Sequence, residues 1–149
     1  MKKLFYFLPL LLAGCTSQSQ LFINANGNIQ RCGSYGYGVG GIILANKIMR
    51  DCEKDMKLAG YIEIEKAGVI GVVLGDSVNI IKVMPHSPAE RSGIKPGMIV
   101  RAIDNKTVRT KNEAVNLMFG EAHTKIMISC NDSTYVMQRE PYTDIFGTK

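Results

Sequence analysis

The sequence predicts an α+β protein, in which a β-hairpin and a helix precede a partly open β-barrel or sandwich. Three observations predict this class. Asn26-Gly27 lies between two apolar stretches, which is a common hairpin pattern. Residues 39–59 carry apolar side chains at helical spacing. From Tyr61 onwards, turn residues separate five or six short apolar or alternating stretches, with two short helices among them.

The first 14 residues have the pattern of a secretion signal peptide. Lys2 and Lys3 precede an apolar stretch, Leu4 to Leu12, that is too short to span a bilayer comfortably. The four residues Leu12-Ala13-Gly14-Cys15 resemble a bacterial lipobox, which implies cleavage before Cys15 and acylation of this cysteine, for example with palmitate. We therefore expect a signal peptide at residues 1–14 and a polar, lipidated tether at residues 15–20.

The residue after Cys15 bears on localisation. An aspartate at this position tends to retain a bacterial lipoprotein in the inner membrane, whereas this chain has Thr16. The resemblance therefore implies a lipoprotein of the outer membrane that faces the periplasm. The chain has a formal net charge of +5, of which Lys2 and Lys3 contribute two, leaving +3 for the mature protein. This mild basicity does not predict a nucleic-acid partner.

Secretion places the remaining cysteines in an oxidising compartment, which favours a disulfide. Cys32 and Cys52 are the expected pair, because their bond would join the hairpin to the buried face of the helix and contribute roughly 3 kcal/mol. That face is predicted to comprise Ile42, Ala45, Ile48, Met49, Cys52, Met56 and Ala59. Gly60 is the expected stop of the helix, and Cys130 is expected to be a buried thiol.

Metal and nucleotide sites are the alternatives for this part of the chain. A metal site is disfavoured because the cysteines form no Cys-x-x-Cys pattern and have no histidine nearby. The glycines of GSYGYGVGG lack both a Gly-Lys-Ser/Thr ending and an acidic residue at the distance a dinucleotide fold requires. They predict tight turns or close packing instead, and we expect no metal, cofactor or small-molecule substrate.

Ser87 and His86 are the residues that could suggest a hydrolase. Adjacency does not aim the two side chains at one another, and the chain has no Gly-x-Ser-x-Gly segment and only one other histidine, His123. Ser87-Pro88-Ala89-Glu90 fits the start of a short helix ended by Gly93. We therefore expect no catalytic residues and no enzyme activity, and hydrolysis with Ser87 as nucleophile is the alternative hypothesis.

Three segments resemble a PDZ domain of the type found in bacterial periplasmic high-temperature-requirement proteases. They are GVIGV at residues 68–72, SPAERSGIKPGMIVRAIDNKTV at residues 87–108 and KNEAVNLMF at residues 111–119. The last begins after a capping box formed by Thr110 and Glu113. The resemblance covers about residues 67–140 and implies a groove for peptide C-termini. We expect a hairpin and helix at residues 21–61, a PDZ-like domain at residues 62–140 and a tail at residues 141–149.

The groove has a physical rationale, because a loop that rises into an apolar strand can offer N–H groups to a carboxylate and a free edge to a peptide. The expected ligand is a protein or peptide C-terminus with an apolar last residue. Two helix stripes are open, Ala114/Leu117/Met118 and Val115/Met118/Phe119. The candidate peptide-binding residues are Gly68, Val69, Ile70, Gly71, Val72, Val115, Met118 and Phe119. In the alternative hypothesis the groove is silent, and a structural or assembly lipoprotein contacts partners through residues 21–61.

Overall fold

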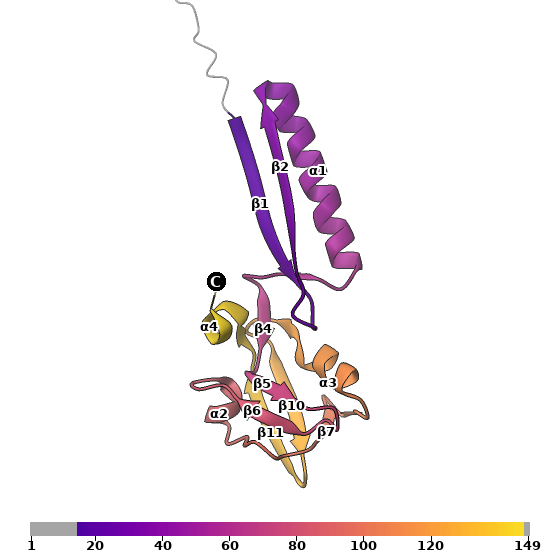
Figure 1. The fold of residues 1–149 in the computed structure, drawn as a ribbon, viewed down its shortest axis with the longest axis vertical. Coiled ribbons are helices and arrows are strands. Elements are labelled where there is room, and N and C mark those ends of the chain that lie inside the picture. Colours follow the sequence, from indigo (N-terminus) through magenta and orange to yellow (C-terminus); the bar gives the residue numbers. More distant parts are fainter. Residues whose placement is uncertain (1–14, 148–149) are drawn as a thin grey trace, which may run out of the picture.

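The computed structural model describes residues 15–147, so the expected signal peptide lies outside the described residues. The chain begins with two long strands, β1 (Cys15–Ile23) and β2 (Ile29–Tyr37), and the helix α1 (Gly38–Leu58). We call residues 15–60 the arm, because these elements project away from the rest of the molecule (Figure 1). Residues 15–20, expected as a tether, are part of β1 and pair with β2.

Residues 61–147 form the body, which consists of short strands and three short helices. Its helices are α2 (Pro88–Arg91), α3 (Lys111–Met118) and α4 (Tyr142–Phe146). Its strands are β3 (Ile62–Glu63), β4 (Ala67–Val69), β5 (Val72–Leu74), β6 (Ile80–Val83), β7 (Val100–Ile103), β8 (Lys106–Thr107), β9 (Gly120–Glu121), β10 (Lys125–Cys130), β11 (Ser133–Gln138) and β12 (Glu140–Pro141).

The strands pair in small antiparallel sheets, with the orders β11-β10-β7-β8, β12-β4-β9 and β5-β6, whereas β3 joins β1 and β2 of the arm. The predicted α+β class, with an N-terminal hairpin and helix, is confirmed. The strands are shorter and more numerous than expected. The segment expected as a tail contains α4, which contacts β4 and β12.

The hairpin of the arm is confirmed, but its turn is longer than the two residues Asn26-Gly27. β1 and β2 pair from Cys15 opposite Tyr37 to Ile23 opposite Ile29, which leaves residues 24–28 as the turn. The side chain of Asn24 accepts hydrogen bonds from the N–H groups of Asn26 and Asn28, each at 3.0 Å. This local side-chain bonding, typical of asparagine, stabilises the wider turn.

The predicted disulfide between Cys32 and Cys52 is confirmed, with the two Cα atoms 6.0 Å apart. Beside it, Phe22 and Met49 complete a small core between the hairpin and α1. Ile48 was expected on the buried face but is 47% exposed. The glycines allow close packing: a Cβ added to Gly36 would lie 2.2 Å from the carbonyl oxygen of Gly41 in α1.

The arm is fixed to the body by β3, which pairs with β1 through Phe22 and Ile23. Glu63 of β3 is 9% exposed and forms ion pairs with Lys66 and with Lys57, the latter at 3.7 Å. The hydrogen bond from Lys66 holds the pKa of the Glu63 carboxyl below its usual value, and the positive charge of Lys57 acts in the same direction. The charged cluster therefore links the end of α1 to the start of the body.

The main core lies inside the body, between the small sheets and α3. It includes Ile70, Ile80, Ile103, Ile126 and Ile128, each at most 2% exposed. Cys130 belongs to the same core as a free thiol, as expected, and burial raises its pKa. In the part of the chain that the structure describes, no helix has the length and apolar character needed to cross a membrane.

Candidate functional site

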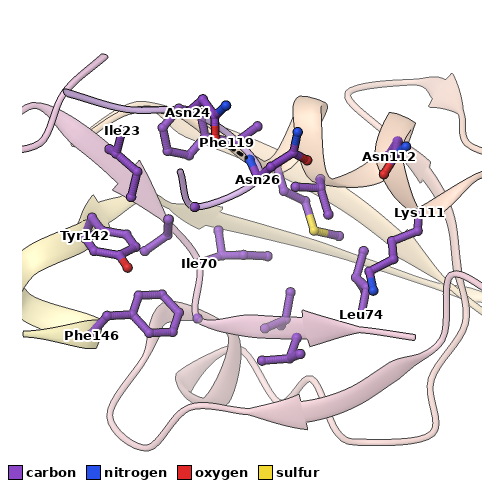
Figure 2. Close-up of a pocket in the computed structure, with 18 residues that line it drawn as sticks. Ile23, Asn24, Asn26, Ile70, Leu74, Lys111, Asn112, Phe119, Tyr142 and Phe146 are labelled. Atoms are coloured by element: carbon purple, nitrogen blue, oxygen red, sulfur yellow. Dashed lines mark hydrogen bonds between the residues drawn. The ribbon is translucent and has the colours of Figure 1, made fainter. Parts of the chain in front are cut away.

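A cavity of about 360 Å³ lies between β5 and α3 (Figure 2). One side is formed by residues 69–74, which run from the end of β4 through β5, and the other by α3. Most of the lining is apolar, and Lys111 is the one charged residue among the lining residues that the structure describes. The cavity therefore suits an apolar ligand group that carries few charges.

β5 presents an unpaired edge to this cavity. In the described residues its one partner strand is β6. The N–H of Met84 donates to the carbonyl of Gly71 at 2.7 Å, and the N–H of Gly75 donates to that of Asn79 at 2.8 Å. In an antiparallel ladder the hydrogen-bonded and non-bonded pairs alternate. The backbone groups of Val72 and Leu74 are therefore directed away from β6, where an added strand could meet them.

The loop before β5 supplies further donors. The N–H groups of Ile70 and Gly71, both lining the cavity, donate no hydrogen bond to any atom of residues 15–147. The carbonyl oxygens of the same two residues are occupied, because the N–H of Ala89 donates to Ile70 at 3.0 Å and that of Met84 to Gly71. The loop is thus held through its carbonyls while its N–H groups remain available to an anion.

Ser87 supports this loop from the side of α2. Its side chain is fully buried, and its Oγ accepts a hydrogen bond from the N–H of Glu90 at 3.3 Å. The Glu90 carboxylate accepts in turn from the N–H of His86 at 2.7 Å. The predicted helix start at Ser87 and Pro88 is therefore confirmed. Arg91 then joins α2 to β12 by bonding the His86 carbonyl and the Glu140 carboxylate.

The helix α3 forms the opposite wall, and its start is fixed by the predicted capping box of Thr110 and Glu113. Of the two stripes left open by the sequence, Val115, Met118 and Phe119 line the cavity. Ala114 belongs to the core and is fully buried. Lys111 and Asn112 extend the wall towards Leu74, as Figure 2 shows.

All the predicted peptide-binding residues except Gly68 line the cavity. Gly68 lies inside β4, where it pairs with Gly120 of β9 and Pro141 of β12. A Cβ at Gly68 would lie 2.6 Å from the backbone of Ala122. Its assignment to the groove is therefore corrected: it permits close strand packing beneath the cavity.

Residues 80–131 match the family model of the PDZ domain. This part of the chain is a PDZ domain. The match covers the segments from β6 to β10, including α2 and α3, and begins shortly after the loop at residues 69–72 and β5. PDZ domains generally bind peptide C-termini. A search of curated proteins found no similar sequence.

Arg139, which lies beyond the residues that match the PDZ model, supports α3 and was not predicted from the sequence. Its guanidinium is buried and donates to the carbonyls of Leu117 and Met118, both at 2.8 Å, and to Thr124 Oγ1 at 2.8 Å. Burial lowers the pKa of Arg139, and the charge of Asp104 partly opposes that change. The cation lies at the negative end of α3 and holds the last turn of the groove helix in place.

Two segments outside the PDZ match also line the cavity. The arm contributes Ile23 and the turn residues 24–27, and α4 contributes Tyr142 and Phe146. The rings of Tyr142 and Phe146 stack with their centroids 4.9 Å apart. Figure 2 shows Asn26, Phe119, Tyr142 and Phe146 among the side chains around the cavity. The cavity is therefore completed by segments that lie before and after the residues matching the PDZ model.

In residues 15–147, no three His, Cys, Asp or Glu side chains are grouped as metal ligands would be. His123 has a positive φ of 64°, and its backbone carbonyl accepts a hydrogen bond from Gln138 Nε2 at 2.7 Å. The contacts of its backbone account for its place in a turn.

Proposed function

We propose that the protein is a lipid-anchored lipoprotein of the bacterial cell envelope that captures protein or peptide C-termini ending in an apolar residue. The observation that carries this proposal is the combination of a free β5 edge with unpaired N–H groups at one end of an apolar cavity. No catalytic step is part of the proposal.

In the proposed complex, the ligand adds as an extended strand along β5 and bonds the outward backbone groups of Val72 and Leu74. Its terminal carboxylate accepts hydrogen bonds from Ile70 and Gly71. Hydrogen bonds to a charged group contribute roughly 1.5–3 kcal/mol each. The last side chain enters the apolar space between Ile70 and Met118, where full burial of a Val or Leu side chain contributes roughly 1.5–3 kcal/mol.

The proposed anchor is Cys15. This cysteine ends the lipobox-like segment, and its side chain is exposed at the start of β1. The bond between Cys32 and Cys52 suits an oxidising compartment such as the periplasm. Thr16, in place of an aspartate, favours the outer membrane. Mass spectrometry of the N-terminal peptide from purified protein tests this assignment: an unacylated Cys15 would remove the anchor from the proposal.

The groove is tested by fluorescence anisotropy with peptides that end in Val, Leu or Phe. Each peptide is compared with its C-terminal amide, which lacks the carboxylate, and with a version ending in Asp. We expect the free, apolar carboxyl form to bind best. Equal binding of the acid and the amide would contradict the carboxylate site.

A matched pair of variants separates groove effects from general effects of charge. Val115→Glu places a carboxylate in the cavity wall, whereas Val136→Glu places one on β11, where Val136 is 64% exposed and does not line the cavity. We expect Val115→Glu to abolish capture and Val136→Glu to preserve it, with thermal unfolding as the check on folding. Preserved capture by a folded Val115→Glu variant would exclude the groove.

A further inference from the structure

An exposed apolar surface occupies the end of the arm that is farthest from the body. Five side chains form this surface, which we call the apolar tip: Tyr35 (89% exposed), Tyr37 (70%), Val39 (76%), Ile43 (65%) and Leu44 (58%). Tyr37 pairs with Cys15 and Tyr35 with Ser17 in the hairpin. The apolar tip therefore lies beside Cys15, at the end of the arm remote from the groove (Figure 1).

The first turns of α1 are apolar on every side. Residues 38–45 of this helix, GVGGIILA, include no polar side chain and span about 12 Å at 1.5 Å per residue. A helix segment that is apolar all round is normally buried. Here Ala45 is buried, whereas Val39, Ile43 and Leu44 remain more than half exposed in the described residues. Exposed apolar surface of this kind marks an interaction site.

The charges of the chain are distributed so that the same end is basic. Without the expected signal peptide, residues 15–50 contain three basic side chains (Arg31, Lys47 and Arg50) and no acidic one, and the remaining 99 residues contain 13 of each, so the net charge of +3 arises in residues 15–50. On α1 the first charged residues after the apolar turns are Lys47 and Arg50, and Asp51 is the first acidic residue of the chain. Such basic residues would meet anionic lipid headgroups favourably.

We propose that the apolar tip inserts into the bilayer surface beside Cys15, so that the protein contacts the membrane through its own side chains as well as through its acyl anchor. This inference rests on the proposed lipid anchor. Two observations favour lipid over a second copy of the chain: the charge that flanks the apolar turns of α1 is basic, and two tyrosines lie in the apolar tip. Tyrosine is enriched at membrane interfaces.

The inserted depth follows from the geometry. Amphipathic helices lie with their apolar faces about 5–10 Å into the boundary between headgroups and acyl chains. The apolar turns of α1 span about 12 Å along the helix axis, slightly more than that depth, and Lys47 and Arg50 follow them, where they would lie at the level of the phosphates. The apolar tip would add a second contact beside the acyl anchor and fix the direction in which the arm leaves the membrane.

The chain has no tryptophan, so a single introduced indole reports its own surroundings. We would purify the full, natively processed chain with Tyr37→Trp in the apolar tip or Val136→Trp on β11 as the control. Each protein is reconstituted into phosphatidylethanolamine and phosphatidylglycerol vesicles, with or without brominated acyl chains. We expect Tyr37→Trp emission to shift to shorter wavelength and to be quenched by bromine, and Val136→Trp emission to be unchanged.

Sedimentation with the vesicles separately measures whether the acyl anchor attaches the protein to the membrane. Protein that sediments with vesicles but shows the same unquenched emission at both positions would overturn the apolar tip and leave the anchor intact. Protein that does not sediment would overturn both. A blue-shifted Tyr37→Trp signal that bromine does not quench would assign the tip to a second copy. Ile43→Asp, added to Tyr37→Trp, is expected to reduce quenching without changing sedimentation.

Discussion

Gly71 packs so closely against Ser87 that a Cβ added to Gly71 would lie 2.3 Å from the Ser87 Cβ. Gly71 also has a positive φ of 78°, which side chains rarely adopt. The two residues belong to different segments: Gly71 lines the cavity, and Ser87 is the N-cap of α2. Contact with Ser87 therefore helps to position the loop before β5.

Gly71→Ala tests this contact. The positive φ alone costs an alanine about 1–2 kcal/mol, and the clash with Ser87 adds to that cost by displacing the loop. We expect a lower free energy of unfolding and a loss of peptide binding. Gly93→Ala is the matched control, because Gly93 has a φ of 85° and no atom within 4 Å of an added Cβ. Equal effects of the two changes would show that the Ser87 contact contributes nothing.

Arg139→Met tests the support of α3. Loss of the guanidinium leaves the carbonyls of Leu117 and Met118 without their donor, at about 1–3 kcal/mol for each buried unsatisfied group. We expect a destabilised PDZ domain and weaker peptide binding, measured by urea unfolding and anisotropy. Arg139→Lys keeps the charge but cannot reach all the same acceptors, so it is expected to recover only part of the loss. If Arg139→Lys restored stability and peptide binding completely, the positive charge alone would be enough to support α3.

Glu63→Gln tests the link between arm and body. The folded protein holds the pKa of Glu63 below its usual value of about 4.3. The ionised carboxylate therefore contributes stability that is present above the unfolded-state pKa and is lost as pH falls through the folded-state pKa. We expect Glu63→Gln to lower the free energy of unfolding at pH 7 and to weaken its decline in acid. If the free energy of unfolding declined in acid as much in Glu63→Gln as in the natural protein, the lowered pKa of Glu63 would be contradicted.

Removal of the disulfide by Cys32→Ala with Cys52→Ala tests the arm. The closed loop has a sequence separation of 20, for which the chain-entropy account gives about 3 kcal/mol. We expect faster amide hydrogen exchange in β2 and α1, with much less change in β10 of the body. Reductant should reproduce this effect in the natural protein and have none in the double variant. If amide hydrogen exchange became equally faster in the arm and in the body, the two parts would unfold together.

Asn26→Asp tests the contribution of the arm to the cavity. Asn26 lines the cavity, so a new negative charge there would oppose a ligand carboxylate. We expect severalfold weaker binding of peptide acids and a smaller effect on the corresponding amides, with greater loss at low ionic strength. Asn105→Asp is the control, because Asn105 is exposed in the turn between β7 and β8 and does not line the cavity. Unaltered binding by Asn26→Asp would place the ligand away from the arm.

Features encoded in short segments were predictable from the sequence. The helix caps at Ser87 and Thr110 depend on pairs of residues three positions apart. The apolar face of α1 that includes Cys52 depends on helical spacing. Val115 and Phe119 were among the candidates because they share one face of a helix.

Features that depend on tertiary contacts were not predictable in this way. Arg139 gives no local indication that it binds carbonyls more than 20 positions earlier in the chain. Ile48 has the spacing of a buried residue, yet the arm has only one hairpin to cover α1, so the far side of this helix stays exposed. The turn at Asn24 differs from the short asparagine-glycine turn because its side chain bonds two N–H groups.

The turn of the arm and the PDZ groove meet in one cavity, although residues 24–27 and Val115 are far apart in the sequence. A recombination event that joined this PDZ domain to a different N-terminal segment would therefore also remodel its ligand cavity. Arm and domain are expected to be inherited as one unit, and substitutions in the turn to be compensated in α3.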